Sequence, residues 1–302
     1  MNTEANRKTE WVVGIGEALW DILPEGRKIG GAPANFAYHM SQFGLRSCAV
    51  SAVGDDEAGR ELRNQLREKG VGHMLETVPF PTGTVEVTLD GAGIPSYEIR
   101  QGVAWDNIPF TPQIEELARH TRAACFGSLA QRSSVSHRTI GRFLETMPDG
   151  EGQYKVFDIN LRQHFYTQQV VEESLRKCNI LKINDEELAV VGGMFGMEGM
   201  QPGEQCRMLL DRYGLRIVIL TCGAAGSSVF APDTRSYIPT PRVEVADTVG
   251  AGDSFTASFL AALLSGLGIG EAQAGRGCRG PRLLAARRHA PAARTVYRSA
   301  AQ

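Results

Sequence analysis

Cysteine is scarce in this sequence, and the few residues present are scattered without a Cys-x-x-Cys pair. This spacing argues against a disulfide framework or a zinc site, and it is typical of reduced thiols in a cytoplasmic protein. The histidines likewise show no metal-binding spacing. The cysteines are Cys48, Cys125, Cys178, Cys206, Cys222 and Cys278.

Long apolar runs are also missing. The longest, residues 255–269, is interrupted by Ser, Thr and Gly and is too short to span a bilayer. The first ten residues are polar and carry no apolar signal-peptide core. With a formal net charge of -2 there is no overall excess of charge that would indicate a nucleic-acid or membrane partner. We therefore expect a cytoplasmic protein that binds small molecules.

Several common catalytic motifs are absent. The sequence contains no G-x-x-x-x-G-K-[ST], which argues against a P-loop enzyme, and no Ser-His-Asp elbow. Gly14 and Gly16 follow an apolar run, but Leu19 stands where a dinucleotide fingerprint needs its third glycine. A lone G-x-G is weak support for a dinucleotide site.

Apolar residues are plentiful, at 42% of 302 residues, and they occur in alternating strand and helix patterns. Such alternation indicates βαβ units. The sequence predicts an α/β fold with a doubly wound, mostly parallel sheet and helices on both faces. Helices are expected at residues 34–43 and 56–69, and strands at 11–15, 47–53, 123–126, 155–159, 180–183 and 217–221.

One segment breaks this alternation. Residues 84–90 alternate polar and apolar side chains, Asp90-Gly91 favours a turn, and residues 97–100 resume the pattern. We interpret residues 80–106 as a small antiparallel β lid over the ligand edge of the sheet. A surface hairpin without a role in binding is the alternative.

A glycine-rich stretch, VADTVGAGDSF, stands at residues 245–255. A short strand is expected at 243–245, and apolar residues recur at helical spacing after Asp253. Gly250, Ala251 and Gly252 therefore form the turn into a helix N-terminus, where backbone N–H groups lack intrahelical partners. Together with the helix dipole, these groups can hold phosphate oxygens. The pattern predicts an anion site.

Asp253 lies in the first turn of that helix, and Asp247 supplies a second carboxylate nearby. A carboxylate in this position can take a proton from an attacking hydroxyl while the turn neutralises a transferring phosphoryl group. We therefore predict that Asp253 is a general base. A capping role is the alternative.

Three further motifs precede this stretch, and the four together carry a family resemblance. They are GGAPANFA at 30–37, NDEE at 184–187 and LTCGAAG at 220–226. From about residue 11 to 270 their order and spacing resemble the ribokinase-like (PfkB) carbohydrate kinase family. The GGAPAN form, with DILP at 21–24 and AWD at 104–106, looks most like bacterial fructokinases. The resemblance implies a kinase domain over residues 11–272.

The resemblance also implies roles at the sugar site. Asp21 and Asn35 would hydrogen-bond sugar hydroxyls, while Gly30 and Gly31 would let the backbone approach the sugar closely. A turn carboxylate, a helix cap and turn glycines are the alternatives. Asn160 and Arg162 lie past a strand end, where ligands of open α/β sheets collect. Arg162 would contact the sugar or a phosphate, or only pair with an acid.

On the nucleotide side, the resemblance places Asn184 and Glu187 near the ATP phosphates, with Glu187 linked to Mg²⁺. The alternative is a solvated acidic helix start. Thr221, Gly223 and Gly226 would shape the nucleotide pocket, or only a strand-end turn, and Asp247 would also lie on this side. ATP, Mg²⁺ and a monovalent cation such as K⁺ are the implied ligands. Members of the family often dimerise through the lid.

Residues 273–302 depart from the family pattern. They contain seven arginines, eight alanines and no acidic residue, in place of the segment that walls the adenine and monovalent-cation sites in family members. We interpret this atypical tail as the product of a frameshift after about Glu271, which sequencing the source gene would test. A solvated tail, or a basic tail that binds nucleic acid, is the alternative.

These features predict an ATP-dependent sugar kinase that converts D-fructose to fructose 6-phosphate. Within the enzyme class, the alternative is a kinase for 2-keto-3-deoxygluconate, another hexose or a nucleoside, because sugar choice rests on a few pocket contacts. Outside it, the alternative is a sugar-binding protein whose catalysis the abnormal tail impairs.

Overall fold

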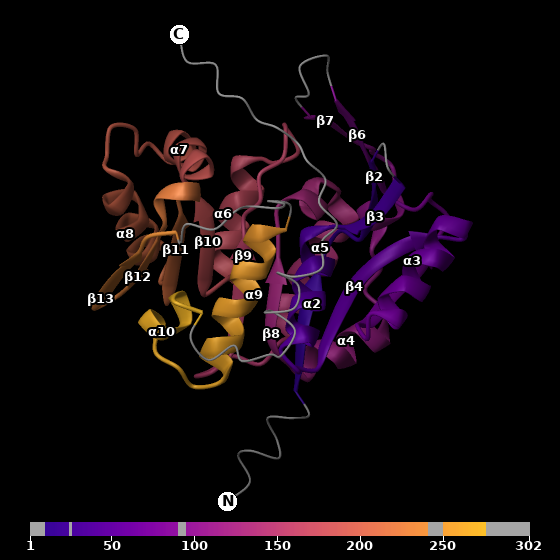
Figure 1. Cartoon of the computed structure of the whole chain (residues 1–302), viewed down its shortest axis with the longest axis horizontal. Coiled ribbons are helices and arrows are strands. Elements are labelled where there is room, and N and C mark those ends of the chain that lie inside the picture. The colour runs from indigo at the N-terminus through magenta and orange to yellow at the C-terminus, as the bar shows by residue number, and fades with distance from the viewer. Residues whose placement is uncertain (1–9, 24–25, 90–94, 241–249, 276–302) are drawn as a thin grey trace, which may run out of the picture.

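The computed structural model describes residues 10–23, 26–89, 95–240 and 250–275. A nine-stranded sheet forms the centre of the molecule, and its neighbouring strands from β11 to β5 run parallel, with β12 and β13 added antiparallel at one edge (Figure 1). In spatial order the strands are β13 (Thr234–Ile238), β12 (Ser227–Ala231), β11 (Ile217–Thr221), β10 (Ile180–Asn184), β9 (Tyr154–Asp158), β8 (Thr121–Phe126), β1 (Trp11–Ile15), β4 (Ser47–Gly54) and β5 (Gly72–Val78).

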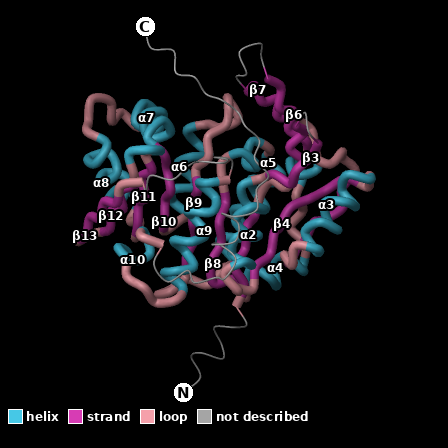
Figure 2. Tube along the Cα trace, viewed as in Figure 1, coloured by secondary structure: helices cyan, strands magenta, loops and turns pink. Residues whose placement is uncertain are grey.

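Helices cover both faces of this sheet, because successive strand side chains point to opposite sides and both sets are apolar (Figure 2). On β1, Val13 packs into the core under one set of helices and Val12 into the core under the other. The first set is α4 (Pro112–Arg119), α5 (Ser134–Thr146), α6 (Gln168–Lys177), α7 (Asp185–Met194) and α8 (Pro202–Tyr213); the second is α2 (Ala32–Gln42), α3 (Glu57–Glu68), α9 (Ala251–Leu264) and α10 (Ile269–Gln273). The predicted doubly wound α/β fold is confirmed.

A second sheet of four strands, in the order β3-β2-β6-β7, contains the segment predicted to be a lid, and within it β2 pairs parallel with β6. The predicted hairpin is present as β6 (Thr84–Leu89) paired antiparallel with β7 (Pro95–Ile99), and its turn at Asp90-Gly91 lies outside the described residues. The sequence analysis missed the other hairpin, β2 (Leu19–Leu23) with β3 (Gly26–Gly30). Neither strand has a clean polar–apolar alternation, because adjacent Leu19 and Trp20 are both buried in β2, and residues 26–28 at the start of β3 are all exposed.

Several predicted boundaries shift by a few residues. The first helix begins at Ala32 rather than 34, and Asp56 caps the second helix by accepting a hydrogen bond from the Gly59 N–H at 2.7 Å. The strand expected at 243–245 and residues 276–302 of the tail lie outside the described residues. Gln273, placed in the tail from the sequence, instead ends α10, is buried, and donates to the Ser227 carbonyl at 2.7 Å.

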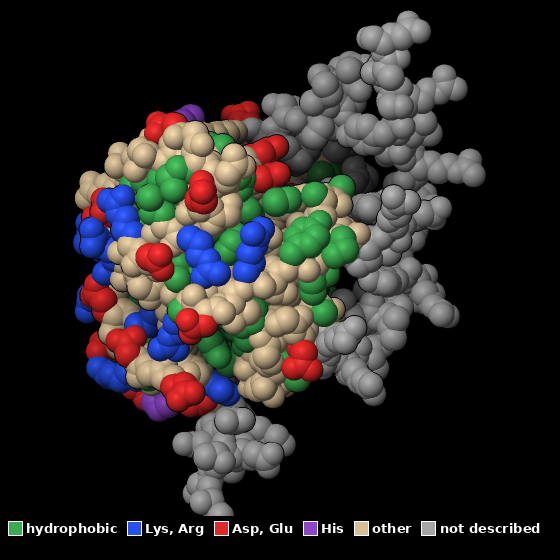
Figure 3. All heavy atoms as spheres, turned by 90° about the vertical axis from the view of Figure 1, so that its left-hand side faces the viewer, with side chains coloured by type: hydrophobic (Ala, Val, Ile, Leu, Met, Phe, Trp, Pro, Cys, Tyr) green, Lys and Arg blue, Asp and Glu red, His purple; other side chains and the backbone are tan. Residues whose placement is uncertain are grey.

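The charged side chains are mixed in sign on the face formed by α7, α8 and β13. Figure 3 shows acidic and basic groups interspersed there, with small apolar areas between them. Within the part of the chain that the structure describes, no helix is long and apolar enough to cross a membrane.

The closest packing in the fold joins β1 to α2. A Cβ built on Gly14 would lie 1.9 Å from the Pro33 carbonyl oxygen, so only glycine lets the first turn of α2 rest on the strand. This contact places the N-terminus of α2 at the carboxyl edge of the sheet.

Gly14→Ala is expected to destabilise the protein by more than about 2 kcal/mol, because the new methyl group would force α2 away from β1. Gly193→Ala is the matched control. Gly193 lies in α7 with open space around a Cβ built on it, so alanine is expected to raise the free energy of unfolding by about 0.5–1 kcal/mol. Urea unfolding of both variants checks this, and equal stabilities would contradict it.

Candidate active site

The predicted base and the predicted sugar-binding amide meet at the carboxyl edge of the sheet. Asn35, in the first turn of α2, donates through Nδ2 to Asp253 Oδ2 at 2.9 Å. Asp253 comes from the first turn of α9, whose N-cap is Gly250 and not the aspartate. The capping alternative for Asp253 is therefore not what the geometry shows.

The environment of Asp253 suits proton transfer. Burial and the nearby Asp158 carboxylate raise the pKa of Asp253 to about 6, and the Asn35 hydrogen bond and the charges of Lys182 and Arg162 act in the opposite direction. A carboxyl group with a pKa this close to neutral can accept a proton and release it again during turnover.

The glycine turn at residues 250–252 leads into α9, as predicted. Gly250 is left-handed, with φ of 75°, and the Ser254 N–H makes the first helical bond to the Gly250 carbonyl at 2.9 Å. The preceding N–H groups of the turn have no intrahelical partner and sit at the positive end of the helix dipole. A developing phosphate charge could be stabilised there.

Asp21 lies beside the segment in which β3 runs into α2, the helix that carries Asn35. Asp21 lies in strand β2, so its interpretation as a turn carboxylate is wrong. A Cβ on Gly30 would lie 2.2 Å from Asp21 Oδ2, and one on Gly31 would lie 2.3 Å from the Glu17 carbonyl oxygen. Both glycines are thus needed for close packing where β3 runs into α2, with Asn35 four residues beyond Gly31.

Asn160 and Arg162 follow β9 at the same edge, as predicted. Asn160 has the unusual φ of 48°, and its carbonyl accepts a hydrogen bond from the Ser128 hydroxyl at 3.3 Å. Arg162 is exposed, and its charge lowers the pKa values of both Glu17 and Asp253. Among the described residues it forms no salt bridge, so the acid-pairing alternative is not realised in this structure.

Asn184 and Glu187 form a reciprocal cap at the start of α7. Glu187 Oε2 accepts from the Asn184 N–H at 2.9 Å, Oε1 accepts from the Leu161 N–H at 3.0 Å, and Asn184 Oδ1 accepts from the Glu187 N–H at 2.8 Å. Glu187 is only 6% exposed, so a fully solvated acidic start is wrong for this residue, although Asp185 and Glu186 are exposed.

The described part of the chain holds no group of three or more His, Cys, Asp or Glu side chains arranged for a metal. Magnesium usually keeps several waters and takes only one or two protein carboxylates, with the substrate phosphates completing its shell. Glu187, whose oxygens each have capacity beyond one backbone hydrogen bond, fits that requirement.

The predicted nucleotide residues at 221–226 lie on the next strand along. Thr221 ends β11, and Gly223 and Gly226 shape its turn into β12, with φ of 48° and 137°. A Cβ on Gly226 would lie 2.4 Å from the Ile238 carbonyl oxygen. The strand-end turn is therefore real, and Asp247 lies outside the described residues.

Sequence reasoning missed Glu17, which follows β1 and is 2% exposed. Its Oε2 has no hydrogen-bond partner, and burial raises the pKa of Glu17 to about 7, against the lowering effects of backbone hydrogen bonds and Arg162. The signal in the sequence was its place directly after Gly14-x-Gly16 at a strand end. Asp158 and Lys182 were also missed, because the sequence does not show that their side chains contact each other across two neighbouring strands.

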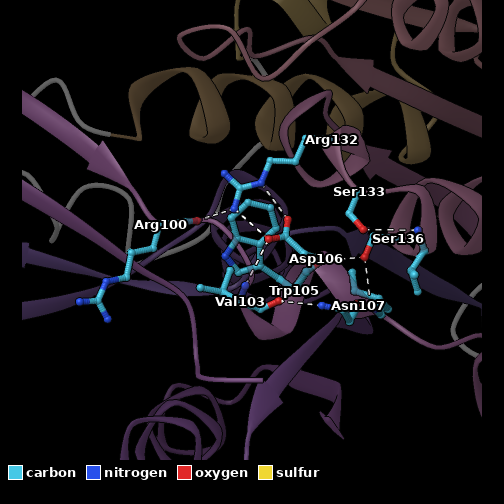
Figure 4. A network of polar contacts seen from close by, with 10 residues as sticks. Arg100, Val103, Trp105, Asp106, Asn107, Arg132, Ser133 and Ser136 are labelled. Carbon is cyan, nitrogen blue, oxygen red and sulfur yellow. Dashed lines mark hydrogen bonds and ion pairs between the residues drawn. The ribbon is translucent and has the colours of Figure 1, made fainter. Parts of the chain in front are cut away.

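A buried ion pair anchors the lid to the large domain (Figure 4). Arg132 donates from Nε and Nη2 to the two carboxylate oxygens of Asp106 at 2.8 and 3.0 Å, and Nη2 also contacts the Arg100 carbonyl. The guanidinium stacks 4.0 Å from the Trp105 ring. Because Arg100 to Asp106 lead out of β7, this pair fixes the lid's return to the domain.

Comparison with known proteins decides the family. A profile described as pfkB family carbohydrate kinase matches residues 25–274. The chain belongs to this family. It is a carbohydrate kinase, and the resemblance noted in the sequence is confirmed.

Relatives of the kinase differ in their substrates. It is 30% identical to a fructokinase from Klebsiella pneumoniae over 269 residues, covering 84% of this chain and 83% of the relative. It is 26% identical to the aminoimidazole riboside kinase of Salmonella typhimurium over 264 residues, covering 83% and 79%.

Solved structures share its fold. An uncharacterized sugar kinase from Pyrococcus horikoshii in complex with ATP aligns with a TM-score of 0.67 at 25% identity, covering 82% of this chain and 83% of that one. A fructokinase double mutant from Vibrio cholerae O395, bound to fructose, ADP and a potassium ion, aligns with a TM-score of 0.72 at 22% identity, covering 91% and 92%.

Glu17→Gln is expected to stabilise the kinase at pH 8 by of order 2–3 kcal/mol and to change little near pH 4.5. In the folded kinase the pKa of Glu17 is raised from 4.5 to about 7. The protonated side chain therefore contributes its full share to folding stability below pH 4.5, and this stability is lost as the pH rises through 7. Glutamine carries no charge to desolvate. Urea unfolding at both pH values measures the difference. The exposed Glu198→Gln is the control, and a gain that does not depend on pH would contradict the assignment.

Arg132→Met is expected to destabilise the kinase by about 3–5 kcal/mol, because it leaves the Asp106 carboxylate buried without its partner. The control is Arg176→Met, which breaks a more exposed i,i+4 pair with Glu172 and is expected to cost less than about 1 kcal/mol. Urea unfolding compares the two, and similar losses would show that the buried pair has no special weight.

Proposed function

We propose that this kinase transfers the γ-phosphoryl group of ATP to a sugar hydroxyl, with the 6-hydroxyl of D-fructose as acceptor. The observation that carries the proposal is the placement of Asp253 in the glycine-led first turn of α9, hydrogen-bonded to Asn35 from α2. A base and an anion hole in one helical turn are what in-line phosphoryl transfer requires.

In this proposal Asp253 takes the proton of the sugar hydroxyl as its oxygen attacks the γ-phosphorus. The bond from the γ-phosphorus to the bridging oxygen breaks, and that oxygen leaves as part of ADP with the bonding electrons. Asp253 later releases the proton to solvent. Backbone N–H groups of residues 250–252 would stabilise the charge on the transferring group. Asp21 and Asn35 would orient the sugar, and Arg162 would add a positive charge at the open side.

Nucleotide binding is proposed on the other side of the transfer site. Asn184, Thr221, Gly223 and Gly226 lie at the carboxyl ends of β10 and β11, and Asp247 is proposed with them. Glu187 would hold Mg²⁺, which neutralises phosphate charge when bound. The ATP-bound and potassium-bound relatives support ATP and K⁺ as ligands. Dimerisation through the lid and a cytoplasmic location stay predictions.

A second substrate class is favoured by one relative. The aminoimidazole riboside kinase is nearly as similar to this chain as the fructokinases, so a nucleoside acceptor is the alternative. Other hexoses and 2-keto-3-deoxygluconate are further alternative acceptors, because the choice of acceptor depends on a few contacts in the pocket.

Fructose-dependent ADP release from Mg-ATP is expected, and Asp253→Asn is expected to lower kcat by about 10²–10⁴-fold, because the proton acceptor is lost. A coupled assay with fructose, other hexoses, 2-keto-3-deoxygluconate and aminoimidazole riboside measures the acceptor preference. Asp211→Asn, an exposed carboxylate on α8, is the control.

Turnover with another acceptor only would move the assignment to that sugar. Sugar binding by calorimetry, without turnover or ATP binding in a folded sample, would favour the impaired sugar-binding protein. Full activity in Asp253→Asn would overturn the mechanism.

A further inference from the structure

A cluster of three buried side chains lies directly beneath the first turn of α9. Lys182 Nζ donates to Asp158 Oδ1 at 3.0 Å, and the Thr256 hydroxyl lies 2.9 Å from Asp158 Oδ2. The side chains of Lys182 and Asp158 are 10% and 7% exposed, and Thr256 is 1% exposed. Strands β9 and β10 and helix α9 each contribute one member.

The cluster touches the glycine turn itself. Thr256 Oγ1 also lies 3.0 Å from the Gly252 carbonyl, so the single hydroxyl proton is shared between that carbonyl and Asp158. A Cβ on Gly252 would lie 3.1 Å from Lys182 Nζ. The ammonium group therefore sits against the turn that is proposed to stabilise the transferring phosphoryl group.

Every element packed around Asp253 contributes a polar or charged group. Asn35 comes from α2, Glu17 from the loop after β1, and the buried Cys125 thiol from β8. Asp158 and Arg162 come from β9 and the loop after it, and Lys182 comes from β10. Of these, Lys182 and Asp158 are the pair with opposite charges that are both buried and in contact.

We propose that Lys182, Asp158 and Thr256 act as one positioning unit, in which the ion pair sets the charge state of Asp253 and the threonine holds the α9 turn in place. The inference rests on the proposed function, in which Asp253 is the base. A buried ion pair is costly to desolvate and is seldom worth its cost in stability alone. Because this pair lies under the turn where charge is proposed to develop, its electrostatic effect would act on the reacting groups.

The two charges are expected to act on Asp253 in opposite directions. The Asp158 carboxylate raises the pKa of Asp253, and the Lys182 ammonium lowers it. Removing one of these charges is expected to move the titration of Asp253 by about one pH unit. A role in packing alone would make both substitutions change stability and would leave the titration of Asp253 where it was.

The test compares Asp158→Asn with the double variant Asp158→Asn/Lys182→Met, so that removing the Lys182 charge does not leave Asp158 as a buried carboxylate without its partner. The acid limb of kcat/KM is expected near pH 6 in the wild-type kinase. It is expected about one unit lower in Asp158→Asn, and higher again by about one unit in the double variant. Limbs that coincide in all three proteins would overturn the proposal.

A direct titration separates this inference from the proposed function. The Asp253 carboxyl signal is followed by NMR in protein labelled at aspartate, and Asp253→Asn assigns it. If the signal moves as expected while the rate profile does not follow it, the ion pair is supported and Asp253 is not the base. If the signal does not move, the ion pair has no such effect.

Thr256→Val tests the positioning half without changing any charge, and it keeps the proposal testable if Asp158→Asn does not fold. It is expected to lower kcat about tenfold, with the acid limb unmoved, because small misplacements of a reacting group are costly. Thr256→Ser, which keeps the hydroxyl, is expected to recover most of the loss. Unchanged kcat in Thr256→Val would remove the threonine from the unit.

Discussion

The hydrogen bond from Asn35 to Asp253 joins two helix N-termini that are 218 residues apart in the sequence. It can form only because α2 rests on β1 where Gly14 has no side chain, which brings the start of α2 beside the start of α9. The chain enters α2 from lid strand β3 through Gly31. The predicted lid, the proposed sugar-binding residues and the proposed base therefore all depend on the position of one helix.

The same arrangement crowds charge into a poorly solvated place. Glu17 and Asp158 are buried close to Asp253, and their desolvation is offset by Lys182, by backbone hydrogen bonds and by the exposed Arg162. Burial raises the pKa values of Glu17 and Asp253, and this lowers the stability of the folded state above neutral pH. A protein selected for stability alone would replace them, and the proton transfer proposed at this edge would account for their presence.

Much of this could be predicted from the sequence, and the omissions have a common cause. The glycine turn and Asp253 form a local pattern at a helix start, which can be recognised without knowing where the helix packs. Asn35 was predicted only through the family resemblance of its motif. The parallel strands were predictable because they are apolar on both faces. The β2–β3 hairpin was missed because neither short strand alternates: β2 begins with two adjacent buried residues, Leu19 and Trp20, and β3 begins with three adjacent exposed ones, at 26–28. Glu17, Asp158 and Lys182 were missed because a single charged residue in a strand or after it becomes informative only when its partner across the sheet is known.

The packing of the lid adds a constraint on how acceptor binding and catalysis relate. Asp21 Oδ2 lies against the end of β3, where a Cβ on Gly30 would come within 2.2 Å of it, so its carboxylate lies beside the strand that leads into α2. An acceptor bound by Asp21 would thus lie beside the segment that carries Asn35. Because Asn35 is hydrogen-bonded to Asp253, the same segment would also position the acceptor relative to Asp253. Acceptors that cannot reach both groups would lose orientation at the base as well as affinity. Discrimination in this kinase should therefore appear in kcat as much as in KM.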